Sequence, residues 1–121
     1  MTRRVVVGPP GAGKSTWAAG SGLLHLEREQ FASDPEFQAA AAVSAGQRNA
    51  RVAVVRTCVS RREEWVWRRS LEVTEVVTLD GGGPEVCRAR CVERGRPGLS
   101  VELDGIDRWF ASRGWASSGV W

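Results

Sequence analysis

The residues with the clearest chemical meaning lie near the start of the chain, in the run Gly8-Pro9-Pro10-Gly11-Ala12-Gly13-Lys14-Ser15. This run matches the pattern G-x-x-x-x-G-K-[ST], whose glycines let backbone N–H groups turn toward a phosphate. Lys14 is expected to reach the β- and γ-phosphates, and the Ser15 hydroxyl to coordinate a metal ion. The sequence therefore predicts binding of ATP and Mg²⁺ by the following residues: Gly8, Pro10, Gly11, Ala12, Gly13, Lys14, Ser15 and Thr16. The alternative is an ordinary Gly-Pro turn between a strand and a helix.

Proteins that couple hydrolysis to motion ordinarily carry an aspartate at the end of a later strand, where it helps to hold Mg²⁺. The third expected strand of this chain ends at Arg56 without an acid, and the fourth ends at Asp80, which opens a glycine-rich turn. The pattern therefore disfavours a motor ATPase or a GTPase switch.

Two carboxylates follow the second expected strand, in the segment Glu27-Arg28-Glu29. A kinase needs a carboxylate in this region to accept the proton of the attacking hydroxyl. A solvated helix start, where acidic residues are favoured by the helix dipole, explains the same residues without catalysis. Both interpretations stay open at this stage.

A row of arginines precedes the loop at Pro97-Gly98 and consists of Arg88, Arg90, Arg94 and Arg96. Arginines that close over the phosphates would stabilise the charge on a transferring phosphoryl group. Arg90 and Arg94 are four residues apart and lie on one face of the expected helix. We favour this lid-like role over a simple exposed basic face.

Elements that position these residues follow from hydrophobic patterning and helix-start signals. Strands are expected at 3–7, 23–26, 51–56 and 72–79, and helices at 14–19, 34–45, 60–70, 84–94 and 100–113, with Asp34, Ser60 and Ser100 at helix starts. Alternating strands and helices indicate an α/β fold, namely a three-layer P-loop NTPase fold with a small, about four-stranded parallel sheet. We expect one domain over residues 1–115 and a tail over 116–121.

The composition limits the number of domains and the class of partner, but it identifies no reaction. The 121 residues suit one domain, and the net charge of +3 fits anionic substrates, with Lys14 the only lysine among the 17 basic residues. Cys58, Cys87 and Cys91 lack metal-binding spacing and are expected to be reduced thiols. Neither a signal peptide nor a membrane span is predicted, which favours the cytoplasm.

Tryptophan is abundant, with six copies and no tyrosine. Trp17 and Trp65 are expected in the core, Trp67 facing elsewhere, and Trp109 on a last helix that packs on the sheet. Aromatic side chains beside the arginines of the third helix would suit base stacking, although packing is the commoner use. His25 is given no role.

Over residues 3–113 the chain resembles the small P-loop kinases, in particular the kinase domain of bacteriophage polynucleotide kinase, which phosphorylates 5′-hydroxyl ends of nucleic acids. The resemblance rests on the P-loop, the Glu27-Arg28-Glu29 turn, Asp80 and the arginines before Gly95. It implies Glu29 as the catalytic base, with Glu27 as the alternative, and Arg90 and Arg94 as lid arginines.

The chain departs from that family at three positions: Gln30 replaces an acid, Ala32 stands where an arginine grips the nucleic acid, and Arg56 replaces an acid. The leading hypothesis is a Mg²⁺-dependent kinase that acts on a nucleoside, nucleotide or nucleic-acid hydroxyl. A stand-alone ATPase serving a partner and a non-catalytic ATP-binding module are the competing hypotheses.

Overall fold

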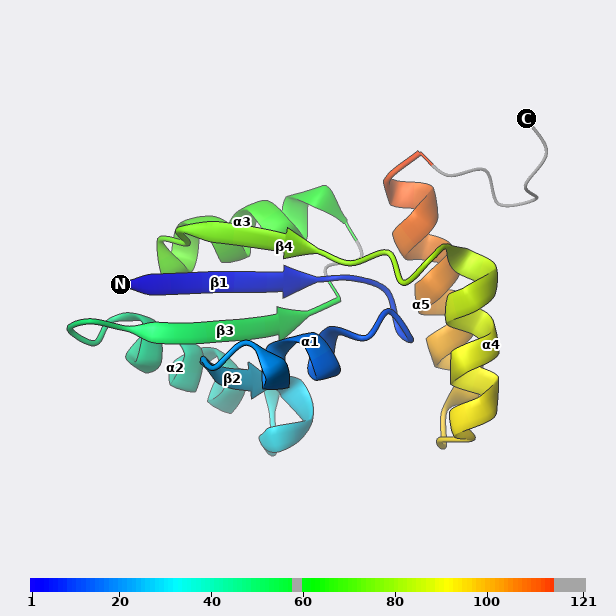
Figure 1. Cartoon of the computed structure of the whole chain (residues 1–121), viewed down its shortest axis with the longest axis horizontal. Coiled ribbons are helices and arrows are strands. Elements are labelled where there is room, and N and C mark those ends of the chain that lie inside the picture. Colours follow the sequence, from blue (N-terminus) through cyan, green and yellow to red (C-terminus); the bar gives the residue numbers. More distant parts are fainter. Residues whose placement is uncertain (58–59, 115–121) are drawn as a thin grey trace.

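The core of the protein is a four-stranded, all-parallel β-sheet with the strand order β2-β3-β1-β4. The structure, a computed structural model, describes residues 1–57 and 60–114. Its strands are β1 (Thr2–Val7), β2 (Leu24–Glu27), β3 (Arg51–Arg56) and β4 (Glu75–Thr78) (Figure 1). The α/β class and the four parallel strands expected from the sequence are confirmed.

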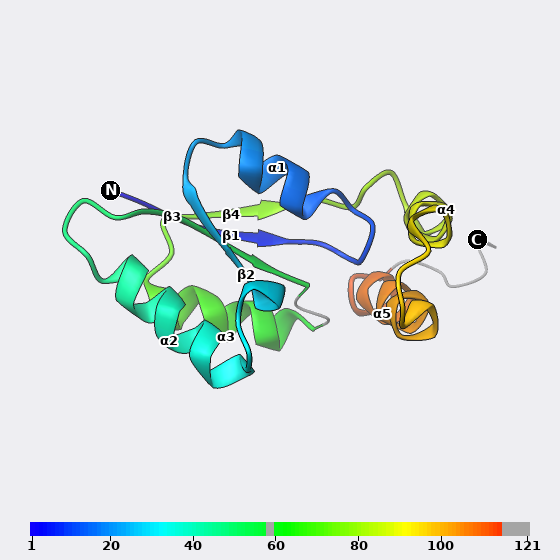
Figure 2. The same cartoon turned by 90° about the horizontal axis from the view of Figure 1, so that it is seen from below.

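Helices cover both faces of this sheet, which explains the unbroken valine runs of its central strands. Helix α1 (Lys14–Gly20) lies on one face, and α2 (Asp34–Ala45) and α3 (Arg61–Leu71) lie on the other (Figure 2). Val6 and Ala18 belong to the smaller core cluster on the α1 side, whereas Val5, Val54 and Phe37 belong to the larger cluster on the α2 and α3 side. The buried strands are thus fixed from both faces.

Two further helices, α4 (Pro84–Arg94) and α5 (Leu99–Ser112), pack on each other beyond the carboxyl ends of the strands (Figure 1). Ile106 and Trp109 of α5 are buried in the larger cluster. Helix α5 thus packs on α4 and also adds side chains to the core cluster that contains residues of the sheet. This position places the helix pair directly beside the loop that follows β1.

Several element boundaries differ from the expected ones for local reasons. Helix α2 is capped by Ser33, whose hydroxyl accepts a hydrogen bond from the Glu36 N–H at 3.3 Å, because the expected cap Asp34 instead pairs with Arg28. Gly98, not Ser100, caps α5. Strand β4 is shorter than expected, since Glu72 adopts a left-handed conformation that ends α3.

The two tryptophans of α3 have the reverse of their expected positions. Trp65 is 56% exposed, whereas Trp67 is only 8% exposed and lies 5.4 Å from the Phe37 ring, centroid to centroid. Residues two apart on a helix point in nearly opposite directions, so one wrong choice of buried face exchanges both. Trp17 is partly buried against the smaller cluster.

Cys87 and Cys91 are buried free thiols. Cys58 and the expected tail over 116–121 lie outside the described residues. Within the part of the chain that the structure describes, no helix combines the length and the apolar character needed to cross a membrane.

Candidate functional site

The order of the strands creates a crevice at the carboxyl edge of the sheet. Neighbouring strands β1 and β3 send their chains to opposite faces, β1 into α1 and β3 into α3 (Figure 2). Ligands of open α/β sheets bind where adjacent strands diverge in this way. The loop over residues 8–13 begins at this point.

That loop is held between the sheet and α4. A Cβ atom on Gly11 would lie 2.6 Å from the Cys87 carbonyl oxygen, so the backbones of the loop and α4 nearly touch. Gly13, the N-cap of α1, has a φ of +86°, and a Cβ there would meet open space. The loop is thus packed on one side and open on the other.

Lys14 folds back over the loop that precedes it. Its Nζ donates hydrogen bonds to the carbonyl oxygens of Gly8 and Pro9, both at 2.8 Å. Burial lowers the pKa of Lys14 to about 8, although the neighbouring Cys87 and Glu29 oppose the shift. The ammonium group therefore sits over the loop, in surroundings that favour an anionic partner.

Ser15 and Glu27 are joined directly, because the Ser15 hydroxyl donates a hydrogen bond to Glu27 Oε1. Glu27 ends β2 and caps the 3-10 helix η1 (Arg28–Gln30), and its backbone N–H donates to Gln30 Oε1 at 3.1 Å. These contacts fix the Glu27 carboxylate beside the serine expected to hold the metal. Glu29, two residues later, is exposed.

The loop, the acids and part of the arginine row surround one cavity of about 390 Å³. Its lining comprises residues 10–16, 27–29 and 55–57 together with Arg94, Arg96 and Glu102. Most of the residues expected to act together are therefore brought together. Gly8 and Arg90 are not in this lining; Gly8 instead contacts Lys14 through its carbonyl oxygen.

Arg90 and Arg94 have different surroundings, although both lie on α4. Arg90 Nη1 donates to the Gly11 carbonyl oxygen at 3.1 Å and lines a neighbouring hollow beside Trp17. Arg94 lines both hollows, and its Nη2 lies 2.7 Å from Glu102 Oε2 on α5. Arg94 is thus held over the loop by an ion pair between α4 and α5.

Asp80, the acid at the end of the fourth expected strand, does not line this cavity. Its Oδ1 accepts a hydrogen bond from the Gly82 N–H at 2.9 Å, and it lines a separate hollow with Arg61 and Trp109. The carboxylate beside the Ser15 hydroxyl is that of Glu27 and not that of Asp80.

A magnesium ion would fit this donor set, because Mg²⁺ binds through one or two carboxylates, hydroxyl groups and substrate phosphates rather than through a full protein cage. Ser15 and Glu27 supply one hydroxyl and one carboxylate. Within residues 1–57 and 60–114, no group of three or more His, Cys, Asp or Glu residues lies close enough to hold a metal ion alone.

Sequence reasoning missed three charged residues of the cavity: Arg28, Arg56 and Glu102. Arg28 and Arg56 follow or end parallel strands, and strand ends meet at one edge of such a sheet, so this signal was available. Glu102 gave no signal, since its place depends on how α5 packs against α4.

No protein-family model matches the chain, and no curated protein matches its sequence.

Proposed function

We propose that this chain has the P-loop NTPase fold and is an ATP-dependent kinase, which transfers the γ-phosphate of ATP to a hydroxyl of a nucleotide or of a nucleic-acid 5′ end. One observation carries the proposal: the loop residues 10–16, the carboxylates of Glu27 and Glu29, and the Arg94 guanidinium line one cavity. Phosphoryl transfer depends mainly on positioning and on electrostatic stabilisation, and these groups supply both.

The phosphate chain of ATP would lie along residues 10–16, with the Lys14 ammonium group beside the β- and γ-phosphates. Ser15 and Glu27 would hold Mg²⁺, which neutralises phosphate charge when bound. Arg94, kept over the loop by Glu102, would stabilise negative charge on the transferring group.

Glu29 is the candidate base. It lines the cavity, and its carboxylate is not engaged with Ser15 as that of Glu27 is. The acceptor oxygen forms a bond to the γ-phosphorus as the bond to the leaving ADP oxygen breaks, and the acceptor proton passes to the Glu29 carboxylate. The contact of Glu27 with Ser15 therefore suits a role at the metal, whereas Glu29 is left for the role of base.

The extent of the cavity supports transfer rather than hydrolysis alone. It continues past the loop to Arg28, Arg56 and Thr57, at the ends of β2 and β3. A hydrolase needs only a water molecule at that position, whereas a kinase needs space for a second substrate.

The test is an acceptor panel with γ-labelled ATP and Mg²⁺, comprising nucleosides, nucleotides and oligonucleotides with 5′-hydroxyl ends. We expect label on at least one acceptor and none with a Lys14→Ala variant. Label that appears only as free phosphate would reject the kinase and favour the stand-alone ATPase. ATP that binds but is never consumed would favour a non-catalytic module.

A further inference from the structure

The exposed side of helix α3 carries a row of arginines around one tryptophan, outside the candidate site. Arg61, Trp65, Arg68 and Arg69 have the spacing i, i+4, i+7 and i+8, so they lie along one side of the helix. All four side chains are exposed. These four residues are called the α3 stripe below.

Trp65 is not needed for the packing of α3 on the sheet. Trp67 and Leu71, on the opposite side of the helix, are buried in the larger core cluster. Trp65 is 56% exposed, and its ring centroid lies 5.1 Å from the guanidinium carbon of Arg69. Such a contact within one exposed helix adds little to stability. A large aromatic ring is therefore left open to a ligand, next to a positive charge.

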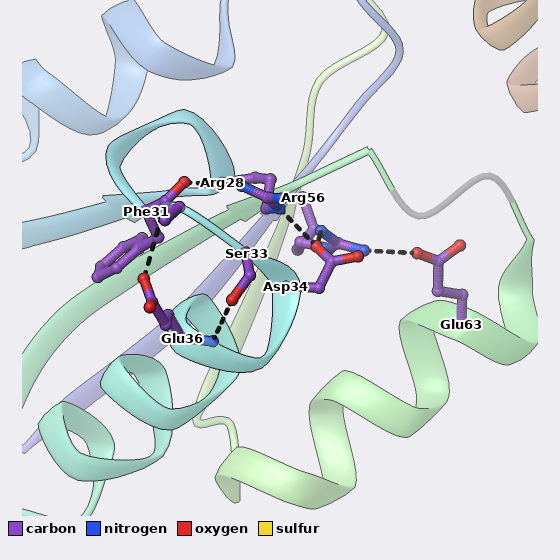
Figure 3. Close-up of polar contacts among 8 residues, drawn as sticks. Arg28, Phe31, Ser33, Asp34, Glu36, Arg56 and Glu63 are labelled. Carbon is purple, nitrogen blue, oxygen red and sulfur yellow. Dashed lines mark hydrogen bonds and ion pairs between the residues drawn. The ribbon is translucent and has the colours of Figure 1, made fainter.

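The positive charge of the α3 stripe is not balanced by ion pairs. Within residues 1–57 and 60–114, no ion pair joins an arginine of the stripe to an acid. The two acids of the helix are less exposed than the stripe: Glu63 pairs with Arg56 at 3.1 Å (Figure 3), and Glu64 lines a hollow with Asp80. The stripe thus has the charge expected of a surface that binds a polyanion.

We propose that the α3 stripe binds single-stranded nucleic acid, with one base stacked on the Trp65 ring and phosphates held by the arginines. Unpaired bases stack on exposed aromatic side chains, and guanidinium groups match phosphate oxygens. At a rise of 1.5 Å per residue, Arg61 and Arg68 lie about 10 Å apart along the helix axis. They therefore reach separate phosphates of one strand, on either side of Trp65.

The same features disfavour other occupants of the stripe. A second copy of the chain would bring like charges together, and a lipid surface requires an apolar helix face, whereas the apolar face of α3 lies in the core. A blunt duplex keeps its bases stacked and offers none to Trp65. Binding on the stripe requires neither ATP nor phosphoryl transfer, so it goes beyond the proposed kinase and does not depend on it.

Fluorescence anisotropy of a 3′-labelled oligothymidylate of about 12 nucleotides, titrated with the whole chain, tests the proposal. The oligonucleotide carries a 5′-phosphate, so it is no acceptor for a 5′-kinase, and ATP and Mg²⁺ are left out. Trp65→Ala should weaken binding by at least about fivefold, whereas Trp65→Phe should keep most of the affinity. Arg48→Gln, at an exposed position between α2 and β3, is the matched control and should change nothing.

An abasic oligonucleotide of the same length separates stacking from charge. The unchanged protein should bind it at least about fivefold more weakly than the oligothymidylate, whereas Trp65→Ala should bind both equally. Arg68→Gln should keep the preference for bases but reduce the slope of log affinity against log salt concentration by about 0.7, the value for one phosphate of a single strand. Trp65→Ala should leave that slope unchanged, a difference that a merely structural role of the helix does not predict.

Four results would overturn the proposal: unchanged affinity in Trp65→Ala, equal affinity for the abasic strand, displacement of the oligonucleotide by ATP, or equally tight binding of an acidic peptide. Displacement by ATP would place the oligonucleotide in the cavity instead, and the peptide result would indicate an acidic protein partner. Oligonucleotide binding that depends on Trp65, without transfer of phosphate to any acceptor, contradicts the proposed kinase alone. Transfer to nucleosides without any binding of the oligonucleotide contradicts the α3 stripe alone.

Discussion

Lys14 is the residue whose charge state matters most at the candidate site. Burial lowers its pKa to about 8, so the ammonium group is fully present below that pH and is lost above it. If ATP binds to the loop as proposed, the charged form is the one that contacts the phosphates, and above pH 8 a proton must be taken up as ATP binds. We therefore expect the affinity for ATP to be flat near neutral pH and to fall by up to about tenfold per pH unit well above pH 8.

Equilibrium binding of ATP, measured between about pH 7 and 10, checks this expectation. A Lys14→Arg variant is the control, because arginine stays charged throughout this range. Its affinity should be independent of pH even if it is lower. A decline of equal steepness in both proteins would show that another group titrates.

Glu27 and Glu29 should respond differently to the loss of their charge. Glu29→Gln removes the proposed base, so we expect the rate of transfer to fall by about 10² to 10⁴ while ATP affinity stays within about twofold. Single-turnover transfer and ATP titration measure the two quantities. Glu85→Gln, at an exposed position of α4, is the control. An unchanged rate in Glu29→Gln would remove this residue as the base.

Glu27→Gln should act through the metal instead, because its carboxylate contacts the Ser15 hydroxyl. We expect the Mg²⁺ concentration for half-maximal rate to rise by about tenfold, with most of the rate recovered at saturating Mg²⁺. A titration of rate against Mg²⁺ measures this. A loss that Mg²⁺ does not restore would favour Glu27 as the base, the alternative that the sequence left open.

At the scale of elements, the contact between the loop and α4 holds the site together. A Gly11→Ala side chain would meet the Cys87 carbonyl oxygen at 2.6 Å, and backbone atoms there cannot move cheaply. We expect its free energy of unfolding to fall by about 2–4 kcal/mol, from a positive φ and overpacking combined. Gly13→Ala shares the positive φ but meets open space, so its loss should be about 1 kcal/mol. Urea unfolding without ATP measures both, and equal losses would contradict this account.

The sequence predicts which elements exist better than where they end or which face they bury. The four strands and their alternation with helices follow from local patterns in the sequence, because strands buried on both faces have continuous hydrophobic runs. Which of Trp65 and Trp67 is buried depends on tertiary contacts instead, and so does the left-handed conformation of Glu72 that shortens β4. Phe37 comes from α2, and its contact with Trp67 is not encoded within α3.

In the candidate site, too, some residues could be predicted from local sequence, whereas others are brought in only by tertiary packing. The loop is contiguous in sequence, so its residues could be predicted as a set, and Glu27 and Glu29 follow from the end of a strand. Arg56 was interpreted only as a position where an acid is missing, because its surroundings come from α2 and α3 as well as β3. Glu102 and its ion pair with Arg94 require the packing of α5 against α4, which local patterning does not contain.

For the whole molecule, the cavity collects residues that lie far apart in the chain, from Pro10 to Glu102. Its lining draws on the loop after β1, the ends of β2 and β3, the end of α4, and α5. Strand ends, the loop, the start of α1 and the two helices beyond the edge of the sheet thus line one cavity. A ligand bound there contacts parts of the chain that separate when the protein unfolds, so binding and global stability are linked.

This linkage predicts the size of thermal stabilisation by ATP. At an ATP concentration about 100 times the dissociation constant, with Mg²⁺ present, stability should rise by about 2.7 kcal/mol, which corresponds to roughly 10 °C in a domain of this size. Lys14→Ala should lose most of this shift at the same concentration, whereas Arg62→Gln should keep it. Differential scanning calorimetry measures all three proteins. If the unfolding temperature of the unchanged protein is insensitive to ATP at every concentration, the loop does not bind ATP, and the kinase proposal fails with it.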